Sequence, residues 1–246
     1  MDKIIKITLG AFIIILIGFI SVIFMNVYIG NAYLASLSGT YSYTLTLTTD
    51  SALSNVTLFI PVPENRTGNS LVIAALSAGN VTGIPGSWTS TLFDTGKTTL
   101  VKITAPAITP PAGTTPENPF SITISVNASS RDHVETRDPV DSGVIFRPVY
   151  YLKEGTCPAG SPAASVGKQC DSYETTMYAD YLSSPNASVS ISSDLAGENN
   201  WNTFGPHSNG YKTGISVTLS GENHGWTMAN GVLTTGIGIY DEPQIP

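Results

Sequence analysis

The sequence predicts an all-β ectodomain, an antiparallel β-sandwich that is jelly-roll-like or immunoglobulin-like, preceded by one N-terminal transmembrane helix. Three observations predict this architecture: an uncharged apolar run near the N-terminus, alternation of apolar and polar residues after it, and a composition poor in charge. Charged residues make up 12% of the 246 residues, about half the usual share. The 23 glycines and 16 prolines are typical of a chain with frequent turns between strands.

The apolar run covers residues 7–30 and contains no charged side chain. As a helix it would be about 36 Å long, enough to cross a hydrocarbon core of about 30 Å. Lys3 and Lys6 precede the run, and no Lys or Arg follows it until Arg66. The positive-inside rule therefore places residues 1–6 in the cytoplasm and the rest of the chain outside the cell. This interpretation is a single-pass membrane protein whose signal anchor has the lipid bilayer as its partner.

Two other uses of the N-terminus stay open. The Gly-Asn-Ala sequence at 30–32 would allow cleavage of a signal peptide before Tyr33, although signal peptides usually have a shorter apolar region of about 7–15 residues. Alternatively, processing after Gly10 would leave a pilin-like assembly helix that begins at Ala11. Pilin-type signals normally have a basic residue before the cleaved glycine, whereas this chain has Leu9. A retained anchor is the preferred interpretation.

Alternation is clearest in residues 41–48, where Tyr and Leu alternate with Ser and Thr. Such a period of two predicts a strand with one buried face. Alternation resumes in residues 56–60 and stops at Pro61. The turn-forming sequence at 50–55 lies between these runs, so we expect the two strands to pair as a β-hairpin.

Further strands are expected at 70–77, 88–93, 98–104, 120–127, 143–151, 175–182, 187–192, 213–219 and 231–240. About ten short strands predict one sandwich over residues 40–240, after a spacer at 31–39 and before a tail at 241–246. The Pro-rich stretch 105–119 is either an internal domain boundary or a long crossover within the sandwich.

Two cysteines, Cys157 and Cys170, enclose a loop rich in Gly, Pro, Ala and Ser. In an exported chain, two cysteines this close are expected to form a disulfide. Closure of a loop of about 14 residues would contribute roughly 3 kcal/mol in the chain-entropy model. Two cysteines alone do not complete a tetrahedral zinc site.

Five sequons of the form Asn-x-Ser/Thr are candidate glycosylation sites: Asn55, Asn65, Asn80, Asn127 and Asn186. All except Asn127, which ends an expected strand, fall in or beside expected turns. Several would occur by chance in a chain this rich in Ser, Thr and Asn.

The densest cluster of charge is at residues 131–141. Four acids recur there at three-residue spacing: Asp132, Glu135, Asp138 and Asp141. Carboxylates in a loop between strands are ligands that Ca²⁺ prefers, so calcium is a candidate cofactor. However, Arg131 and Arg137 offset this charge, and the spacing matches no calcium-loop pattern. A solvated loop with internal ion pairs is the preferred interpretation, and no other cofactor is expected.

The three histidines are candidate catalytic or metal-binding residues. His133 lies beside two acids, but no G-x-S-x-G sequence supplies a nucleophile for a catalytic triad. His207 and His224, with Glu222, lack the spacing of known zinc motifs. A pair of carboxylates for glycoside hydrolysis is a further alternative, because their separation depends on the fold.

Four aromatic residues occur in the Gly- and Asn-rich stretch 197–231: Trp201, Phe204, Tyr211 and Trp226. Exposed aromatic side chains among Asn and Gly are typical of loops that bind carbohydrate or protein. The simpler interpretation, that these side chains cap the core of the sandwich, is preferred.

The net charge of −7 argues against nucleic acid as a partner, because phosphate binding requires many Lys or Arg contacts. We expect a non-catalytic cell-surface protein that serves envelope structure or binds a surface glycan or protein. A pilin-like filament subunit and an exported hydrolase are the alternatives. In composition, the anchor followed by a Thr-rich β domain with sequons is similar to prokaryotic, especially archaeal, envelope proteins.

Overall fold

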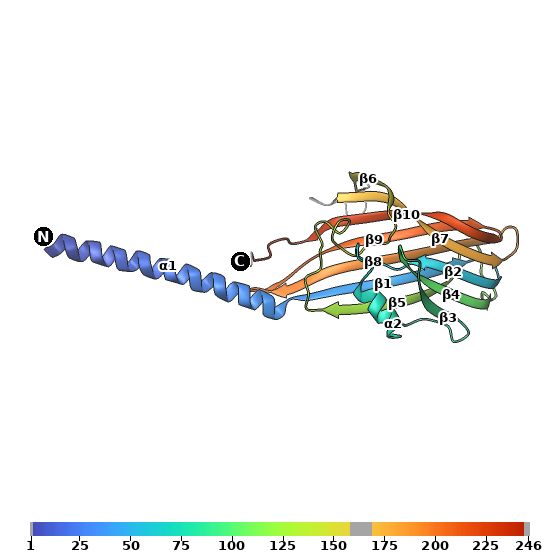
Figure 1. The fold of residues 1–246 in the computed structure, drawn as a ribbon, viewed down its shortest axis with the longest axis horizontal. Coiled ribbons are helices and arrows are strands. Elements are labelled where there is room, and N and C mark those ends of the chain that lie inside the picture. The colour runs from blue at the N-terminus through green and yellow to red at the C-terminus, as the bar shows by residue number, and fades with distance from the viewer. Residues whose placement is uncertain (1, 158–168, 244–246) are drawn as a thin grey trace.

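A computed structural model describes residues 2–157 and 169–243 of the chain. Helix α1 (Asp2–Ser36) projects from one end of an elongated β domain (Figure 1). One further helix, α2 (Leu71–Ser77), lies against the sheet. The strands are β1 (Ser38–Thr49), β2 (Leu53–Pro61), β3 (Thr89–Asp94), β4 (Thr99–Ile108), β5 (Phe120–Ser130), β6 (Tyr150–Thr156), β7 (Gln169–Leu182), β8 (Ser188–Asn202), β9 (Pro206–Ser220) and β10 (Asn223–Gly238).

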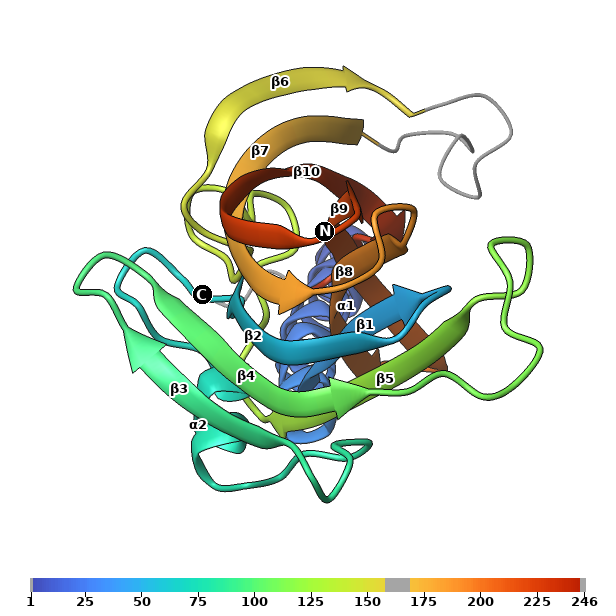
Figure 2. The same ribbon diagram turned by 90° about the vertical axis from the view of Figure 1, so that its right-hand side faces the viewer.

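The ten strands form one antiparallel sheet in the order β3-β4-β2-β7-β10-β9-β8-β1-β5, and β6 pairs with β7. The sheet curls into a half-barrel around a single core (Figure 2). The predicted antiparallel, all-β character of the domain is confirmed.

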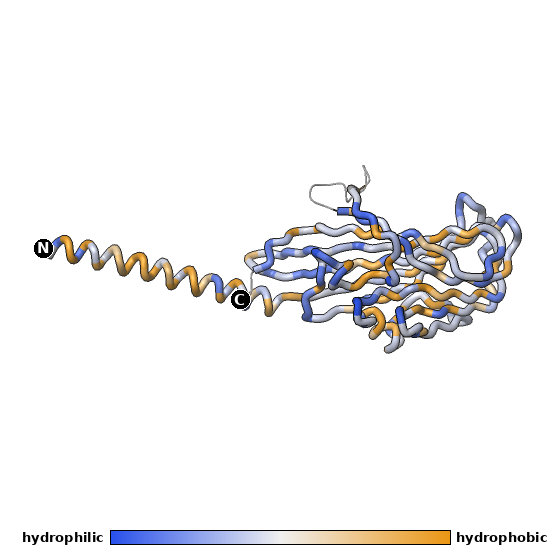
Figure 3. The backbone as a smooth tube through the Cα atoms, turned by 45° about the horizontal axis from the view of Figure 1, so that its top comes forward, coloured by the Kyte–Doolittle hydropathy of each residue, from blue (hydrophilic) through white to orange (hydrophobic). Residues whose placement is uncertain are grey.

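Helix α1 is long and apolar enough to cross a membrane, and no part of its apolar window is buried within the protein. Figure 3 shows its apolar residues extending beyond the β domain. The helix continues to Ser36 through residues that the sequence predicted as a spacer, and β1 begins two residues later. The β domain therefore follows the helix almost directly.

The alternation predicted in β1 and β2 is confirmed, but the predicted hairpin between them is wrong. Strand β1 pairs with β5 and β8, whereas β2 pairs with β4 and β7. Both strands bury one face in the same core. Alternation of apolar and polar residues indicates only that one face of a strand is buried. It does not distinguish two strands that pair from two strands that face each other across a core.

Two other expected strands are wrong. Residues 71–77 form α2, because the Ser70 hydroxyl accepts a hydrogen bond from the amide of Ile73 and caps the helix, which buries Val72 and Ala75. Most of the strand expected at 143–151 is irregular, and β6 begins only at Tyr150.

Strands rather than loops occupy most of the Gly- and Asn-rich stretch 197–231. Two of its glycines lie against buried tyrosine rings. A Cβ atom at Gly197 would lie 2.4 Å from the Tyr211 ring, and one at Gly231 would lie 2.5 Å from the Tyr173 ring. Glycine at these two positions lets the rings pack flat against the strand, so it reflects core packing rather than a loop.

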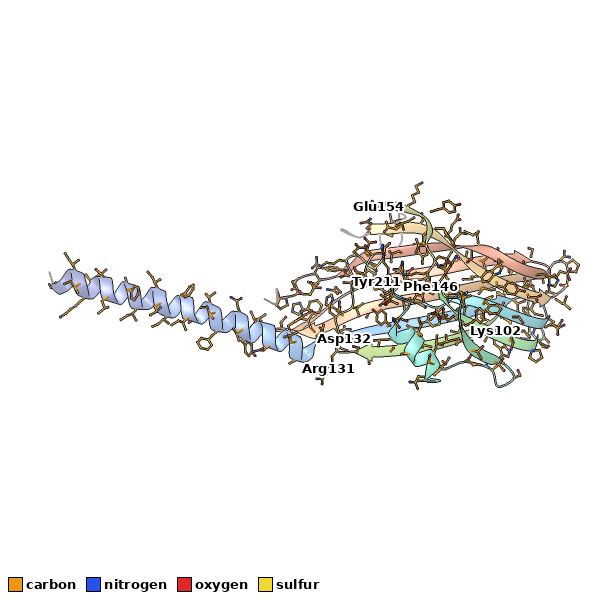
Figure 4. All side chains as sticks on the ribbon, viewed as in Figure 1. Lys102, Arg131, Asp132, Phe146, Glu154 and Tyr211 are labelled. Carbon is orange, nitrogen blue, oxygen red and sulfur yellow. A yellow bond between two sulfur atoms is a disulfide. The ribbon has the colours of Figure 1, made fainter. Side chains whose placement is uncertain are left out.

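A segment without regular strand structure, residues 131–149, packs into the curled sheet and is called the strap. Its Phe146 is fully buried, and its ring centre lies 6.3 Å from that of Tyr43 in β1. The Tyr211 hydroxyl donates a hydrogen bond to the carbonyl of Val144 in the strap. Figure 4 places Phe146 and Tyr211 near the middle of the domain in this view, and both side chains are fully buried. The strap therefore completes the core that the half-barrel leaves open.

Tyrosine side chains make up much of this core. Burial raises the pKa of Tyr43 to about 12, although a hydrogen bond from Ser193 opposes the shift. Burial also raises the pKa of Tyr41 and of Tyr181 to about 12. These phenols stay protonated in the folded protein at a pH where an unfolded chain ionises them.

We expect the domain to lose stability in alkali. The raised tyrosine pKa values mean that stability is complete below pH of about 10, where unfolded tyrosine titrates, and falls as pH rises towards 12. For Tyr43 alone the loss is about 3 kcal/mol. Near-ultraviolet circular dichroism and tyrosinate absorbance, followed together against pH, test this expectation. Ionisation of all tyrosines near pH 10 without loss of the folded signal would contradict it, and Tyr43→Phe should reduce the loss.

Candidate binding surfaces

The outer face of the sheet has a row of aromatic side chains that crosses neighbouring strands in register. Tyr178 of β7 lies opposite Trp226 of β10 on one side and Phe59 of β2 on the other. Phe59 in turn lies opposite Lys102 of β4, and Phe93 of β3 packs on Phe59. We call Trp226, Tyr178, Phe59 and Phe93 the aromatic row.

Neighbouring rings in the aromatic row touch edge to face. The ring centres of Phe93 and Phe59, of Phe59 and Tyr178, and of Tyr178 and Trp226 are each 5.5 Å apart. The rings are inclined by 72°, 81° and 67° respectively. Such contacts hold the side chains in place and contribute about 0.5–1.5 kcal/mol per pair beyond their burial.

The ends of the aromatic row are open to solvent. Trp226 is 59% exposed and Phe93 is 49% exposed, while Phe59 and Tyr178 are half-buried between them. A contiguous exposed apolar surface on a folded domain typically marks an interaction site. By contrast, the outer faces of β1, β8 and β9 have mainly small or polar residues.

Charged groups flank the aromatic row. The Lys102 ammonium lies 5.6 Å from the centre of the Phe59 ring, within the range of a cation–π contact. His224 Nδ1 lies 2.7 Å from a carboxylate oxygen of Asp180, beside Tyr178 and Trp226. Figure 4 shows Lys102 in the half of the domain far from α1. The surface therefore combines apolar rings with one lysine ammonium group and one hydrogen-bonded pair of histidine and aspartate side chains.

The four aromatic residues singled out from the sequence do not lie together. Trp201 is buried, and its ring packs on Tyr33 of α1 at 5.8 Å and stacks on His207 at 5.6 Å. Tyr211 is fully buried in the core, where burial raises its pKa well above the usual value. Phe204 and Trp226 are exposed, Phe204 beside α1 and Trp226 in the aromatic row.

A cleft separates α1 from the turn between β8 and β9. Its volume is about 900 Å³. Its lining comes from α1, the β8–β9 turn and the C-terminal tail: Asn26, Val27, Ile29, Gly30, Asn31, Leu34, Thr203, Phe204, His207, Asp241 and Pro243. The Phe204 ring lies 6.1 Å from the Tyr28 ring across this end of the molecule. This is the second surface at which exposed aromatic side chains gather.

Buried asparagines attach the strap to the sheet. The Asn199 side chain accepts a hydrogen bond from the amide of Val134 and donates one to the carbonyl of the same residue, both at 2.7 Å. It also donates to Asn209 Oδ1 at 3.0 Å, and Thr136 donates to the same oxygen at 3.1 Å. The Asn199 amide therefore pairs with the strap as a neighbouring strand would.

The backbone of a buried residue, Glu64, holds the other end of the strap through a two-way bridge to Ile145. Glu64 is 1% exposed, and its side chain accepts a hydrogen bond from the amide of Thr99 at 3.1 Å. Arg147 of the strap donates to the carbonyl of Glu64 and to that of Val140. Burial lowers the pKa of the Arg147 guanidinium, and the nearby charge of Arg66 adds to this shift. These contacts position the strap and leave no open site around Glu64.

The four acids considered for calcium each have a separate local partner. The partners are the Ser130 hydroxyl for Asp132, the Arg137 amide for Glu135, the Asp141 amide for Asp138 and the Arg66 guanidinium for Asp141. Within residues 2–157 and 169–243, no three His, Cys, Asp or Glu side chains gather closely enough to hold a metal ion. Partners within the strap, together with Ser130 and Arg66 beside it, therefore occupy these carboxylates.

Each histidine lies beside a different acid. His224 pairs with Asp180 in the half of the domain far from α1, and Glu222 lies in the turn before β10. His207 Nδ1 lies 3.1 Å from the Asp241 carboxylate, within ion-pair distance but without a hydrogen bond to it. His133 Nε2 lies 3.9 Å from Glu242. The structure thus does not bring the three rings into one site.

The disulfide and the sequons are the other sites that the sequence predicted. The sulfur atoms of Cys157 and Cys170 are 2.00 Å apart, so the predicted disulfide is seen. Of the five sequon asparagines, Asn65 is half-buried and uses its side-chain oxygen to accept hydrogen bonds from Thr67. The exposed ones are Asn55, Asn80, Asn127 and Asn186.

Sequence reasoning missed three members of the aromatic row, although the signal was present. In the expected strand 56–60, burial of Val56, Leu58 and Ile60 already implied that Phe59 faces outward. In β7, the same alternation of buried and outward-facing side chains places Tyr178 on the outer face of the sheet. Their alignment across four strands depends on pairing, which no single strand reveals.

No protein-family model matches the chain, and no curated protein and no solved structure matches it either, so the function must be argued from these surfaces alone.

Proposed function

We propose that the chain is a single-pass cell-surface protein, anchored by α1, whose non-catalytic β domain binds a protein partner through the aromatic row. Lys3 and Lys6 on one side of the apolar helix support a cytoplasmic N-terminus. The disulfide between Cys157 and Cys170 supports a domain outside the cell, because such bonds persist in oxidising compartments. The halves of the curled sheet face each other across one core, which supports a sandwich-like domain.

The aromatic row is the observation on which the binding role depends. Trp and Tyr, with an adjacent cation, are the residue types that contribute most to protein interfaces. The row lies in the half of the domain far from α1, where a partner outside the membrane would reach it. Edge-to-face stacking keeps the four side chains ordered before binding, which lowers the entropy lost on association.

Ring orientation favours a protein partner over a glycan. Sugar rings stack on flat aromatic faces, whereas successive rings in the row are inclined by 67° to 81°. Met228, two residues from Trp226, extends the exposed apolar surface along β10. The separate positions of the three histidines support a non-catalytic role over that of an exported hydrolase.

A photo-crosslinking amino acid placed at Thr91, which lies opposite Lys102, tests the binding role. In the full chain in its native envelope, we expect Thr91 to capture a discrete protein, and we expect Trp226→Ala to lower the affinity about 30-fold. This loss corresponds to removal of a hot-spot side chain worth about 2 kcal/mol. Because Trp226 is exposed, the variant should fold as the parent does.

Val232→Ala is the matched control, since Val232 is half-exposed on the same strand but outside the aromatic row. We expect it to leave capture unchanged. A probe at Thr218, on the Ser- and Thr-rich outer face, should capture far less of the same protein. Equal capture from Thr218 and Thr91, or binding of a free glycan that is lost with Trp226→Ala, would contradict the proposal.

The pilin-like alternative has one observation in its favour. Helix α1 is joined to β1 by a single residue, and Ser36 exchanges hydrogen bonds with Asn202, as a rigid stalk requires. The mass of the mature chain separates the alternatives, since an anchor begins at Met1, a processed pilin at Ala11 and a secreted domain at Tyr33.

A further inference from the structure

The turn between β8 and β9 extends back along α1. Ser36, the last residue of the helix, accepts a hydrogen bond from the amide of Asn202 at the end of β8. Two residues further on, Phe204 lies beside Tyr28. Tyr28 precedes Ser36 by eight residues. The tip of the turn therefore extends about 12 Å back along α1 from the end of the helix at Ser36, towards the N-terminal part of the helix.

That position coincides with the level at which the helix would leave the hydrocarbon. About twenty residues of helix cross a core of about 30 Å, so a span that begins at Ile7 ends close to Tyr28. Tyr and other aromatic residues are enriched at this interface. Phe204 therefore lies at the level of the lipid headgroups when α1 spans the bilayer.

Phe204 is unusually exposed to solvent for a large apolar residue. Its side chain is 73% exposed, and the backbone has a φ of 60°, a left-handed conformation uncommon for phenylalanine. The turn thus presents the ring outward instead of packing it into the core. In water such exposure costs free energy, whereas at the boundary of headgroups and acyl chains it is favourable.

The cleft beside Phe204 has the character of a lipid site. Val27, Ile29 and Leu34 supply apolar surface from the helix, while Thr203 and Asp241 supply polar groups from the domain. Val27 and Ile29 lie at the end of the expected span, and Leu34 lies about one turn beyond it. The cleft is therefore continuous with the bilayer on one side and with the β domain on the other.

We propose that the β8–β9 turn is a second membrane contact, in which Phe204 inserts into the outer leaflet beside Tyr28 and a lipid of that leaflet occupies the cleft. This inference rests on the membrane anchor proposed above. Its consequence is that the β domain is held at a fixed depth, which keeps the aromatic row directed away from the bilayer.

The test uses the full chain in phosphatidylcholine liposomes, with one nitroxide label at a time. The three labelled variants are Phe204→Cys in the turn, Phe24→Cys in the helix and Phe93→Cys in the aromatic row, and the native cysteines remain paired. Accessibility to oxygen and to a water-soluble nickel chelate is then measured for each label by electron paramagnetic resonance.

We expect the Phe204→Cys label to be protected from the chelate and accessible to oxygen, close to the Phe24→Cys label and unlike the Phe93→Cys label. The label at Phe24→Cys can report lipid while the label at Phe204→Cys reports water, as the label at Phe93→Cys does. That result would overturn the second membrane contact and leave the anchor supported. If Phe24→Cys itself reports water, the anchor fails, and the inference fails with it. Bromine-labelled lipids that quench a Phe204→Trp variant more than the parent provide a second measurement without a bulky label.

Discussion

Replacing Phe146 with alanine is expected to destabilise the domain by about 3–5 kcal/mol, which is a large share of the stability of a typical domain. The side chain is fully buried in the strap and packs against Tyr43. Hydrogen bonds along each strand fix the curvature of the sheet, so the surrounding residues cannot collapse into the space that the ring leaves. The cost therefore combines lost burial with a persistent cavity.

Urea unfolding of the full chain in detergent, followed by near-ultraviolet circular dichroism, measures this effect. Phe93→Ala is the matched control, because it removes the same side chain from a half-exposed position on the outer face. We expect that control to cost about 1–2 kcal/mol, because it also removes the edge-to-face contact with Phe59. Equal effects of the two substitutions would show that the strap does not complete the core.

The second large effect is expected for Asn199→Ala, which should lower the free energy of unfolding by about 2–4 kcal/mol. The substitution removes both hydrogen bonds to Val134 and leaves the buried amide and carbonyl of that residue without partners. Each unsatisfied buried group costs about 1–3 kcal/mol. The strap should also loosen, because Asn199 and Asn209 together hold its first half.

Asn200→Ala provides the control, since the neighbouring side chain is exposed on the same strand. It should change the unfolding free energy by less than about 0.5 kcal/mol. Hydrogen exchange at the amide of Val134 gives a local readout, and we expect faster exchange in Asn199→Ala alone. Unchanged protection of that amide would refute the role assigned to Asn199.

Local patterns in the sequence predicted the parts of the fold that depend on burial of one face. The alternation in β1 and β2 is confirmed, as are the long apolar helix and the pairing of Cys157 with Cys170. Each of these features is set by residues close together in the chain or by simple composition. They therefore did not require knowledge of the neighbouring strands.

Errors arose where non-local contacts decide the structure. The sequence between β1 and β2 resembles a hairpin turn, yet both strands find other neighbours. The segment that became α2 alternates too weakly to separate strand from helix, and the Ser70 cap decides the outcome. In the stretch 197–231, glycines that suggest a loop instead accommodate tyrosine rings from adjacent strands.

Local sequence is enough to predict an apolar N-terminal helix and strands with one buried face, because hydrophobicity and its period are properties of neighbouring residues. Packing in three dimensions sets which strands pair, how the strap closes the core and which aromatic side chains meet. Phe59, Tyr178 and Trp226 are far apart in the chain and become one surface only through strand register. Register depends on the free energy of the whole packed sheet, which no local pattern contains.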